Sequence, residues 1–397
     1  MMNLLKIPLL SPSWYSGRLW LLRLGYYKFT RQKEIANDWI WIVDHTVQIG
    51  TDKCFVILGI RQSSLPLRGN CVSHEDVEPI CLCPVKQSNG KIVFQQLEEA
   101  IEKTGIPREI IGDHGSDLEK GIKDFCQQHH ETCYIYDIKH KTAAVLKHEL
   151  ENDEKWLKFI EHATKTKVSI QQTALAFLSP PNQRSKSRYM NVDILIQWGL
   201  KILAFLNKQQ QEKSNKFDKD QIGEKLGWIT AFCEMLEELE DILQIVETTE
   251  SFVRKTGLYH DCHIELKESM ILMANTDRAK RVQEILLAFV EEESSKAKPD
   301  ERLLGSSEVI ESVFGKLKGI EQDQAKSGFT NLLLSTAAIV SKTTEDVVEK
   351  ALKTVRTKEV LDWCKKNIGH SVQSMRKEAF AFYKKKEQKW DQNLGAA

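Results

Sequence analysis

The order of β-rich and helical segments between residues 38 and 150 is the feature that most limits the possible folds of this chain. Three runs rich in β-branched and aromatic residues come first: "WIWIVDHTVQIG" from residue 39, "KCFVILGIRQ" from residue 53 and "EPICLCPVK" from residue 78. Such runs predict strands. The shorter run "KIVF" at 91–94 predicts one more. A helix is then expected over 95–104, followed by a strand in "REIIGD", a helix in "DLEKGIKDFCQQ" and a strand in "TCYIYDIKHK".

Three antiparallel strands followed by alternating helices and strands predict an α/β fold with a mixed sheet. This order is similar to that of a ribonuclease-H-like core, a five-stranded sheet flanked by helices in which the first strand is central and the later strands run parallel to it. Beyond residue 150 the apolar positions recur at helical spacing, as in "LIQWGLKILAFLN". We therefore expect a large all-α insertion before the core resumes.

These patterns divide the chain into five predicted segments. Residues 1–37 form a basic and aromatic N-terminal segment, 38–150 the first part of the core, 151–303 the helical insertion, 304–345 the last part of the core, and 346–397 a helical basic tail.

Positive and negative side chains are equal in number, 56 each, so the net charge neither favours nor excludes a nucleic-acid partner. The longest apolar run near the C-terminus, 332–340, is far below the roughly 20 residues that a membrane span requires. We expect a cytoplasmic protein with reduced thiols and no membrane association.

Three carboxylates stand in settings that a folded core could bring together. Asp44 and Asp113 each lie where an apolar strand gives way to polar residues, and Glu311 lies on an amphipathic helix that begins after Ser306 or Ser307. Glu308 is the alternative third acid, because it is three residues from Glu311 and shares its helix face.

Three such acids suit a site for two magnesium ions. In two-metal phosphoryl transfer, one ion activates the attacking oxygen and the other stabilises the leaving oxygen. Mg²⁺ prefers oxygen ligands and uses few protein carboxylates, and Mn²⁺ is expected to substitute for it. In this interpretation Asp44 bridges the two ions, and Asp113 and Glu311 each hold one.

The blocks "VDHTVQIG", "GDHGSDLEKGI", "YDIKHKTAAVLK" and "SEVIESVFGKLK", in this order, resemble the bacterial insertion-sequence transposases of the DDE class over roughly residues 38–330. The resemblance implies metal-dependent cleavage of DNA at transposon ends and strand transfer into target DNA, with a homodimer as the active complex. It also implies that Lys318, in a Glu-x6-Lys spacing from Glu311, contacts DNA phosphate, with Lys316 as a close substitute. For the insertion it implies phosphate contacts, for which the candidates are Arg184, Lys186 and Arg188.

Several points remain open at the level of sequence. Asp137 and His140 either support the active site or, equally well, form a helix cap with His140 exposed. His45 and His114 flank the two aspartates and are expected near the substrate.

The segment before the first strand also allows two readings. The stretch 14–33 carries five cations, six aromatics and no acid, which suits a nucleic-acid surface or an ordinary helix whose cations face water. It is the remnant of a DNA-binding module, or else the chain is an N-terminally shortened copy. The alternatives to a transposase are a non-catalytic truncated descendant that regulates by binding DNA, and a structure-specific nuclease of the same fold.

Overall fold

The computed structural model describes residues 12–49, 52–65, 71–182, 189–211, 219–322, 332–368, 376–377 and 379–383. The chain divides into two compact units. Unit 1 comprises residues 1–135 and 307–397, and unit 2 comprises residues 136–306. Each unit is described by itself.

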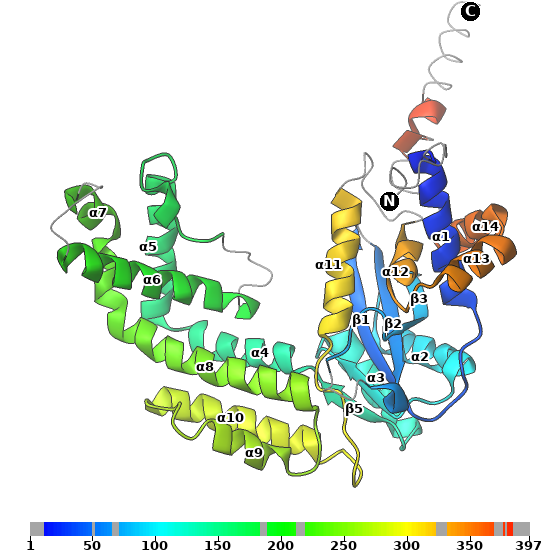
Figure 1. Ribbon diagram of the computed structural model, residues 1–397, viewed down its shortest axis with the longest axis horizontal. Coiled ribbons are helices and arrows are strands. Elements are labelled where there is room, and N and C mark those ends of the chain that lie inside the picture. The colour runs from blue at the N-terminus through cyan, green and yellow to red at the C-terminus, as the bar shows by residue number, and fades with distance from the viewer. Residues whose placement is uncertain are drawn as a thin grey trace, which may run out of the picture. The chain divides into compact units, whose positions relative to one another are not determined.

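The centre of unit 1 is a five-stranded sheet in the order β3-β2-β1-β4-β5 (Figure 1). Its strands are β1 (Trp39–Ile49), β2 (Asp52–Arg61), β3 (Glu78–Val85), β4 (Glu109–Gly112) and β5 (Cys133–Tyr136). Strand β2 pairs antiparallel with both β1 and β3, and β4 runs parallel to β1. This is the ribonuclease-H-like mixed sheet that the sequence predicts, with the first strand in the middle.

Two helices cover one face of the sheet, α2 (Gly90–Thr104) and α3 (Ser116–Gln128). Because side chains alternate along a strand, the odd-numbered residues of β1 face these helices. They form a buried core with residues of the neighbouring elements, including Trp41, Val43, Phe55, Leu97, Ile122 and Phe125.

The predicted strand at 91–94 is wrong, because these residues form the first turn and a half of α2. The Asn89 side chain caps this helix by accepting a hydrogen bond from the Ile92 amide at 3.0 Å. Val93 and Leu97 are four residues apart, the spacing of one helix face, and both are buried in the core. The cap and the apolar face therefore outweigh the β preference of Ile92 and Val93.

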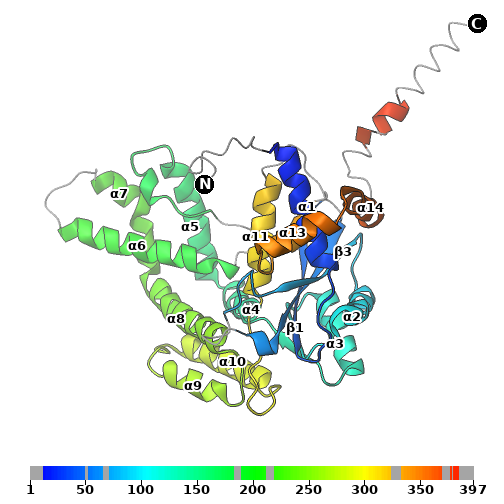
Figure 2. The ribbon, with the colours of Figure 1, turned by 45° about the vertical axis from the view of Figure 1, so that its right-hand side comes forward.

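The other face of the sheet is covered by α1 (Trp14–Thr30), α11 (Glu308–Gln322) and α12 (Leu333–Ile339); Figure 1 labels all three, and Figure 2 shows α1 and α11 from another side. Helix α11 packs on β1, whereas α1 and α12 pack on β3 and on each other. Helices α13 (Glu345–Thr354) and α14 (Thr357–Asn367) pack on α1. The predicted tail from residue 346 therefore begins with two helices that belong to unit 1, followed by helical residues at 376–377 and 379–383.

The basic residues of α1 and the segment after it hold unit 1 together rather than facing solvent. The Lys28 ammonium is fully buried and donates to the carbonyls of Ala338, Val340 and Ser341 at 2.7–3.1 Å. These carbonyls lie at the C-terminal end of α12, where a helix has no internal donors left and favours a cation.

Two further cations follow the same rule. Arg23 donates to the Val355 carbonyl at 2.7 Å, and Lys33 is buried and donates to the Lys28 carbonyl at 2.5 Å. The exposed side chains are instead aromatic, since Trp14 and Tyr15 are 77% and 56% accessible. Both sequence-based readings of 14–33 placed these cations on the surface, and for Lys28 and Lys33 both are wrong.

Unit 2 consists of helices packed around a central one, α8 (Cys233–Thr256), which contacts α4, α6, α9 and α10. The other elements are α4 (Ile138–Leu150), α5 (Glu154–Ile170), η3 (Ala176–Leu178), α6 (Val192–Gln211), α7 (Lys219–Leu226), η5 (Gly227–Phe232), α9 (Cys262–Ser269) and α10 (Asp277–Ser294).

Unit 2 is the all-α insertion that the sequence predicts between the second and third acids, with earlier and later limits than the predicted 151–303. The difference at its start is α4, which packs on α8 instead of continuing the core. Its two ends meet, because the Ile138 amide donates to the Gly305 carbonyl at 3.1 Å. The chain thus leaves and re-enters unit 1 at neighbouring points, which allows a long insertion between β5 and α11. No helix in the described parts of the chain is long and apolar enough to cross a membrane.

Candidate active site

The first two predicted acids lie within β1 and directly after β4, two strands that pair in parallel. In the parallel pairing of β1 with β4, Ile42 lies opposite Ile111. Continued by two residues, past the end of β4, this register puts Asp44 level with Asp113. The sequence placed both acids at strand ends. For Asp113 this is right, because it directly follows β4, whereas for Asp44 it is wrong, because β1 continues to pair with β2 beyond Asp44, which lies opposite Val56.

Gly112 keeps the two strands close up to this point. A Cβ atom added there would lie 3.0 Å from Val43 Cγ2 and 3.1 Å from the Val43 carbonyl oxygen, both tighter than ordinary contacts. A larger residue would push β4 away from β1 immediately before the two aspartates.

Backbone amides orient both carboxylates. Asp44 Oδ1 accepts a hydrogen bond from the His45 amide at 2.6 Å, and Asp113 Oδ1 accepts one from the Gly115 amide at 3.0 Å. The Tyr134 hydroxyl donates to the main-chain carbonyl of Asp113 at 2.6 Å. Both aspartates are half-buried. One oxygen of each carboxylate is therefore fixed in direction by a backbone amide one or two residues further along the chain.

His45 points away from Asp44, because successive residues of a strand face opposite sides. Its ring lies on the α2–α3 side, 5.5 Å from the Phe55 ring centre, and its Nδ1 is 3.9 Å from Asp117 Oδ2. Burial lowers the pKa of His45, so the imidazole is neutral at pH 7. His45 interacts electrostatically with Asp113 as well as with Asp117, and His114 is exposed next to Asp113. That the two histidines lie near the substrate stays a prediction. Asp117, in the first turn of α3, is a further acid that the sequence did not single out.

The third predicted acid lies on the helix that packs against β1. Helix α11 buries one face, formed by Val309, Ile310, Val313 and Phe314. Glu308 and Glu311 are both in its first turns and both half-buried. Helix packing therefore brings α11 to the strand and the sheet face of Asp44, and it leaves two candidates for the third position.

The two candidate DNA-binding lysines lie on different sides of α11. Glu311 and Lys318 are seven residues apart, about two turns, and so occupy one stripe of the helix. Lys316 is rotated about 140° from Glu311 at 100° per residue. Its Nζ lies 3.2 Å from His74 Nδ1. The helix geometry thus distinguishes the lysines, and Lys318 is the one that shares the surface of Glu311.

The donor types fit magnesium, but the three predicted acids are not gathered into a closed ligand set. Half-buried carboxylates on neighbouring strands, Asp44 within β1 and Asp113 after β4, are the kind of oxygen ligand that Mg²⁺ prefers. However, among the residues that the structure describes, no group of three or more His, Cys, Asp or Glu side chains is close enough to hold a metal ion. The strand pairing supplies two acids on neighbouring strands, and α11 supplies the third from a neighbouring element.

The remaining predicted site residues lie in the second unit. Asp137 is fully buried and is the N-cap of α4, since its Oδ1 accepts a hydrogen bond from the His140 amide at 2.8 Å. This is the capping role that the sequence allowed, although His140 is half-buried rather than exposed. Arg184, Lys186 and Arg188 fall outside the described residues.

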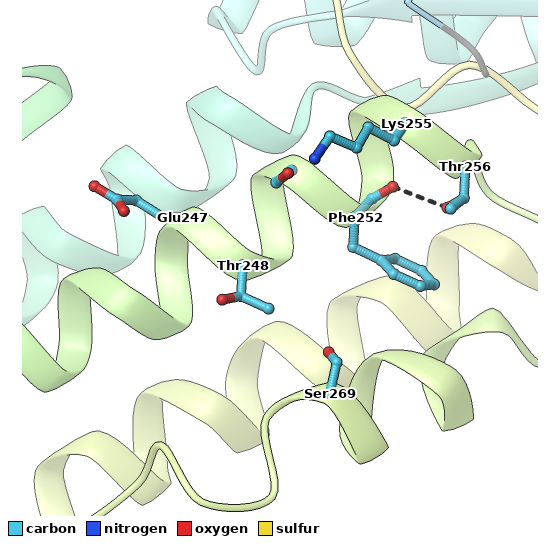
Figure 3. Close-up of a pocket in the computed structure, with 7 residues that line it drawn as sticks. Glu247, Thr248, Phe252, Lys255, Thr256 and Ser269 are labelled. Atoms are coloured by element: carbon cyan, nitrogen blue, oxygen red, sulfur yellow. Dashed lines mark hydrogen bonds between the residues drawn. The ribbon is translucent and has the colours of Figure 1, made fainter. Parts of the chain in front are cut away.

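Unit 2 also contains an open hollow of about 460 Å³ beside α8 and the end of α9 (Figure 3). Its lining includes Lys255, Thr256 and Ser269. The Thr256 hydroxyl donates to the Phe252 carbonyl at 2.8 Å, as it commonly does within a helix. The hollow contains none of the predicted site residues.

Comparisons with known proteins find likeness in structure but none in sequence. No family model and no curated protein matches the sequence. Among solved structures, the chain is similar to the Drosophila P element transposase strand transfer complex, with 10% identity, a TM-score of 0.40, and 85% of this chain and 86% of that chain covered. A likeness at this level does not identify a family. The resemblance to bacterial insertion-sequence transposases therefore stays a prediction from the sequence.

Proposed function

We propose that this protein is a transposase of the DDE class that cleaves DNA at transposon ends and joins them to target DNA with the help of Mg²⁺. The observation that supports the proposal is the parallel pairing of β1 with β4 in a ribonuclease-H-like sheet, because the register of this pairing, continued two residues past Ile42 and Ile111, puts Asp44 level with Asp113. The finer assignment to a bacterial insertion sequence rests on the sequence blocks alone.

In this proposal Asp44, Asp113 and Glu311 hold the metal ions. When bound, the ions activate the attacking oxygen and stabilise the leaving one. The chain's own contribution is orientation: the amides of His45 and Gly115 fix one oxygen of each aspartate. Preset ligand directions reduce the rearrangement that metal and phosphate binding would otherwise require.

The proposal does not require a closed three-acid cluster before DNA binds. Magnesium commonly binds through one or two carboxylates, several waters and the phosphates of the substrate. We therefore expect weak metal binding by the protein alone and tighter binding with DNA. Titration of Mn²⁺ with and without a DNA duplex would test this order, and tight binding without DNA would contradict it.

The direct test is a nicking assay on duplexes that carry the sequence flanking the gene, with Mg²⁺ or Mn²⁺. Asp44→Asn or Asp113→Asn should reduce cleavage by at least about 100-fold, while Asp117→Asn, a nearby acid in the first turn of α3, should retain most activity. Removal of Mg²⁺ by a chelator should stop the reaction. Equal activity in the Asp113 and Asp117 variants would contradict the site.

The third acid is tested by a second matched pair. Glu311→Gln should be inactive and Glu308→Gln nearly normal, since only Glu311 shares a helix stripe with Lys318. The reverse result would assign the site to Glu308 without changing the chemistry. If both variants are active, neither glutamate of α11 belongs to the site.

DNA contact by the helix is tested separately from cleavage. Lys318→Ala should weaken DNA binding and reduce its salt dependence, whereas Lys316→Ala, on another side of the helix, should do so less. A protein that binds DNA but never cuts it would instead be a non-catalytic regulator. Cleavage without preference for the flanking repeats would indicate a structure-specific nuclease. Mass measurement of the DNA complex would test the expected homodimer.

A further inference from the structure

Two cysteines on the edge strand β3 lie in direct contact. Cys81 and Cys83 are two residues apart and so point to the same face of the strand. Their Sγ atoms are 2.9 Å apart. This face is the one covered by α2, where Cys81 joins the buried core and Cys83 packs against it. Cys81 is buried and Cys83 is partly accessible.

The surroundings make the two thiols unequal. The hydrogen bond from Cys81 lowers the pKa of Cys83, and the Lys103 ammonium lowers it further, although burial opposes both. The same hydrogen bond and burial raise the pKa of Cys81. Lys103 is held in place, since its Nζ donates to the Ile80 carbonyl at 2.7 Å and lies 4.2 Å from the Phe29 ring centre. The accessible sulfur is thus the one that favours the thiolate, the form that reacts.

The strand geometry permits a bond between the two sulfurs, with strain. Residues two apart in a strand have Cα atoms about 6.6 Å apart. This is near the upper end of the range for disulfides, roughly 4.4–6.8 Å. Strained disulfides have higher reduction potentials and are the readily reversible ones. A bond here would therefore be reduced readily by small thiols and would need an excess of oxidant to form, instead of acting as a permanent crosslink.

We propose that Cys81 and Cys83 form a redox-active dithiol that small disulfides oxidise reversibly. The Cys83 thiolate attacks one sulfur of the oxidant, which forms a mixed disulfide and releases one small thiolate. The Cys81 thiol then loses its proton and displaces the second small thiolate from Cys83. Two protein thiols and one small disulfide thus become one protein disulfide and two small thiols. This pair is independent of the carboxylates proposed for DNA cleavage.

The test uses the full chain treated with oxidised glutathione, then alkylated, digested with trypsin and analysed by mass spectrometry. Residues 69–86 form one tryptic peptide that contains Cys71, Cys81 and Cys83. Cys71 is exposed and reports whether the oxidant was active. We expect this peptide to lose two hydrogens through a Cys81–Cys83 bond that dithiothreitol reverses, and to do so equally in the Cys71→Ser variant.

Single substitutions separate the two steps. Cys81→Ser should leave Cys83 as a stable mixed disulfide with glutathione, whereas Cys83→Ser should leave Cys81 unmodified. Cys126→Ser, which removes a half-buried cysteine of α3, should not change bond formation. The proposal is overturned if Cys81 and Cys83 stay reduced while Cys71 is modified, or if the bond appears only after denaturation.

Discussion

We predict that the close contact between α1 and α12 is needed for the stability of unit 1. The substitution Gly25→Ala, at this contact, tests the prediction. A Cβ atom at Gly25 would lie 2.9 Å from the Leu334 carbonyl carbon and 3.3 Å from the Ala338 amide nitrogen, and closer still to the Leu334 oxygen. These are backbone atoms, so no rotamer change relieves the overlap. Helix α12 would have to move, and the carbonyls that Lys28 binds lie at its end.

The expected loss follows from two opposing terms. Alanine in place of glycine within a helix stabilises by about 1 kcal/mol. Overpacking typically costs about 1–3 kcal/mol, and more when backbone has to shift. With backbone displacement and weakened Lys28 hydrogen bonds, we expect a net destabilisation of about 2–3 kcal/mol. Gly17→Ala is the matched control on the same helix, because a Cβ there meets nothing within 4 Å and should stabilise instead.

Hydrogen exchange measured by mass spectrometry is the appropriate assay, because two compact units need not unfold together. In Gly25→Ala, peptides from α1 and α12 should exchange about 30- to 150-fold faster, as about 1.4 kcal/mol corresponds to a factor of ten. Peptides from α8 in unit 2 should be unchanged. If Gly25→Ala is as protected as Gly17→Ala, α1 does not depend on this contact, and the reasoning fails.

Three further predictions concern charges inside each unit. The Arg278 side chain is 13% exposed and pairs with Glu149 at 3.0 Å and with Asp153 at 2.9 Å. Arg278→Met should therefore destabilise unit 2 by about 3–5 kcal/mol in urea unfolding. Arg281 is exposed, so Arg281→Met should change the stability by less than about 1 kcal/mol. Burial lowers the pKa of Lys28 and of Lys33 from 10.5 to about 8. Between pH 8 and 10.5 the unfolded state therefore binds more protons than the folded state, and the free energy of unfolding of unit 1 should rise with pH. The rise should reach up to about 3 kcal/mol per lysine. The rise should be smaller in Lys28→Met, and equal pH profiles would refute it. Asp137→Ala should cost about 1 kcal/mol through loss of the α4 cap while Asp137→Asn retains DNA cleavage, and an inactive but stable Asn variant would show a role beyond capping.

The sheet was predictable because its signals are local. Runs such as "WIWIVDHTVQIG" state where a strand begins and ends, and the order of strands and helices leaves few topologies. The exception at 91–94 is instructive, since its three β-favouring residues, Ile92, Val93 and Phe94, also fit the first turns of a helix once Asn89 caps it. The N-cap residue and the amphipathic pattern of α2 are also local signals, and together they outweigh the β preference of the individual residues.

The fate of the N-terminal cations was not predictable from the sequence. Nothing in residues 14–33 indicates that the end of a helix some 300 positions later supplies three carbonyls to Lys28. A sequence pattern reveals that a segment is basic, but the partners of a buried cation are defined only by tertiary packing. Basic composition alone is therefore weak evidence for a nucleic-acid surface.

The acids of the candidate site also differ in whether local sequence patterns or tertiary packing define their positions. Asp44 and Asp113 are brought together by the pairing of two strands, and their positions follow from the local pattern once β1 and β4 are recognised as parallel neighbours. The third acid depends on where α11 rests after the chain returns from unit 2, and a helix can slide or rotate without changing its sequence pattern. Because Glu308 and Glu311 are both half-buried in the first turns, the choice between them depends on a rotation of α11 that no local signal specifies. Metal-dependent cleavage by Glu308→Gln and Glu311→Gln therefore tests the one part of the site that depends on helix packing, while the Asp113 and Asp117 pair tests the part fixed by the sheet.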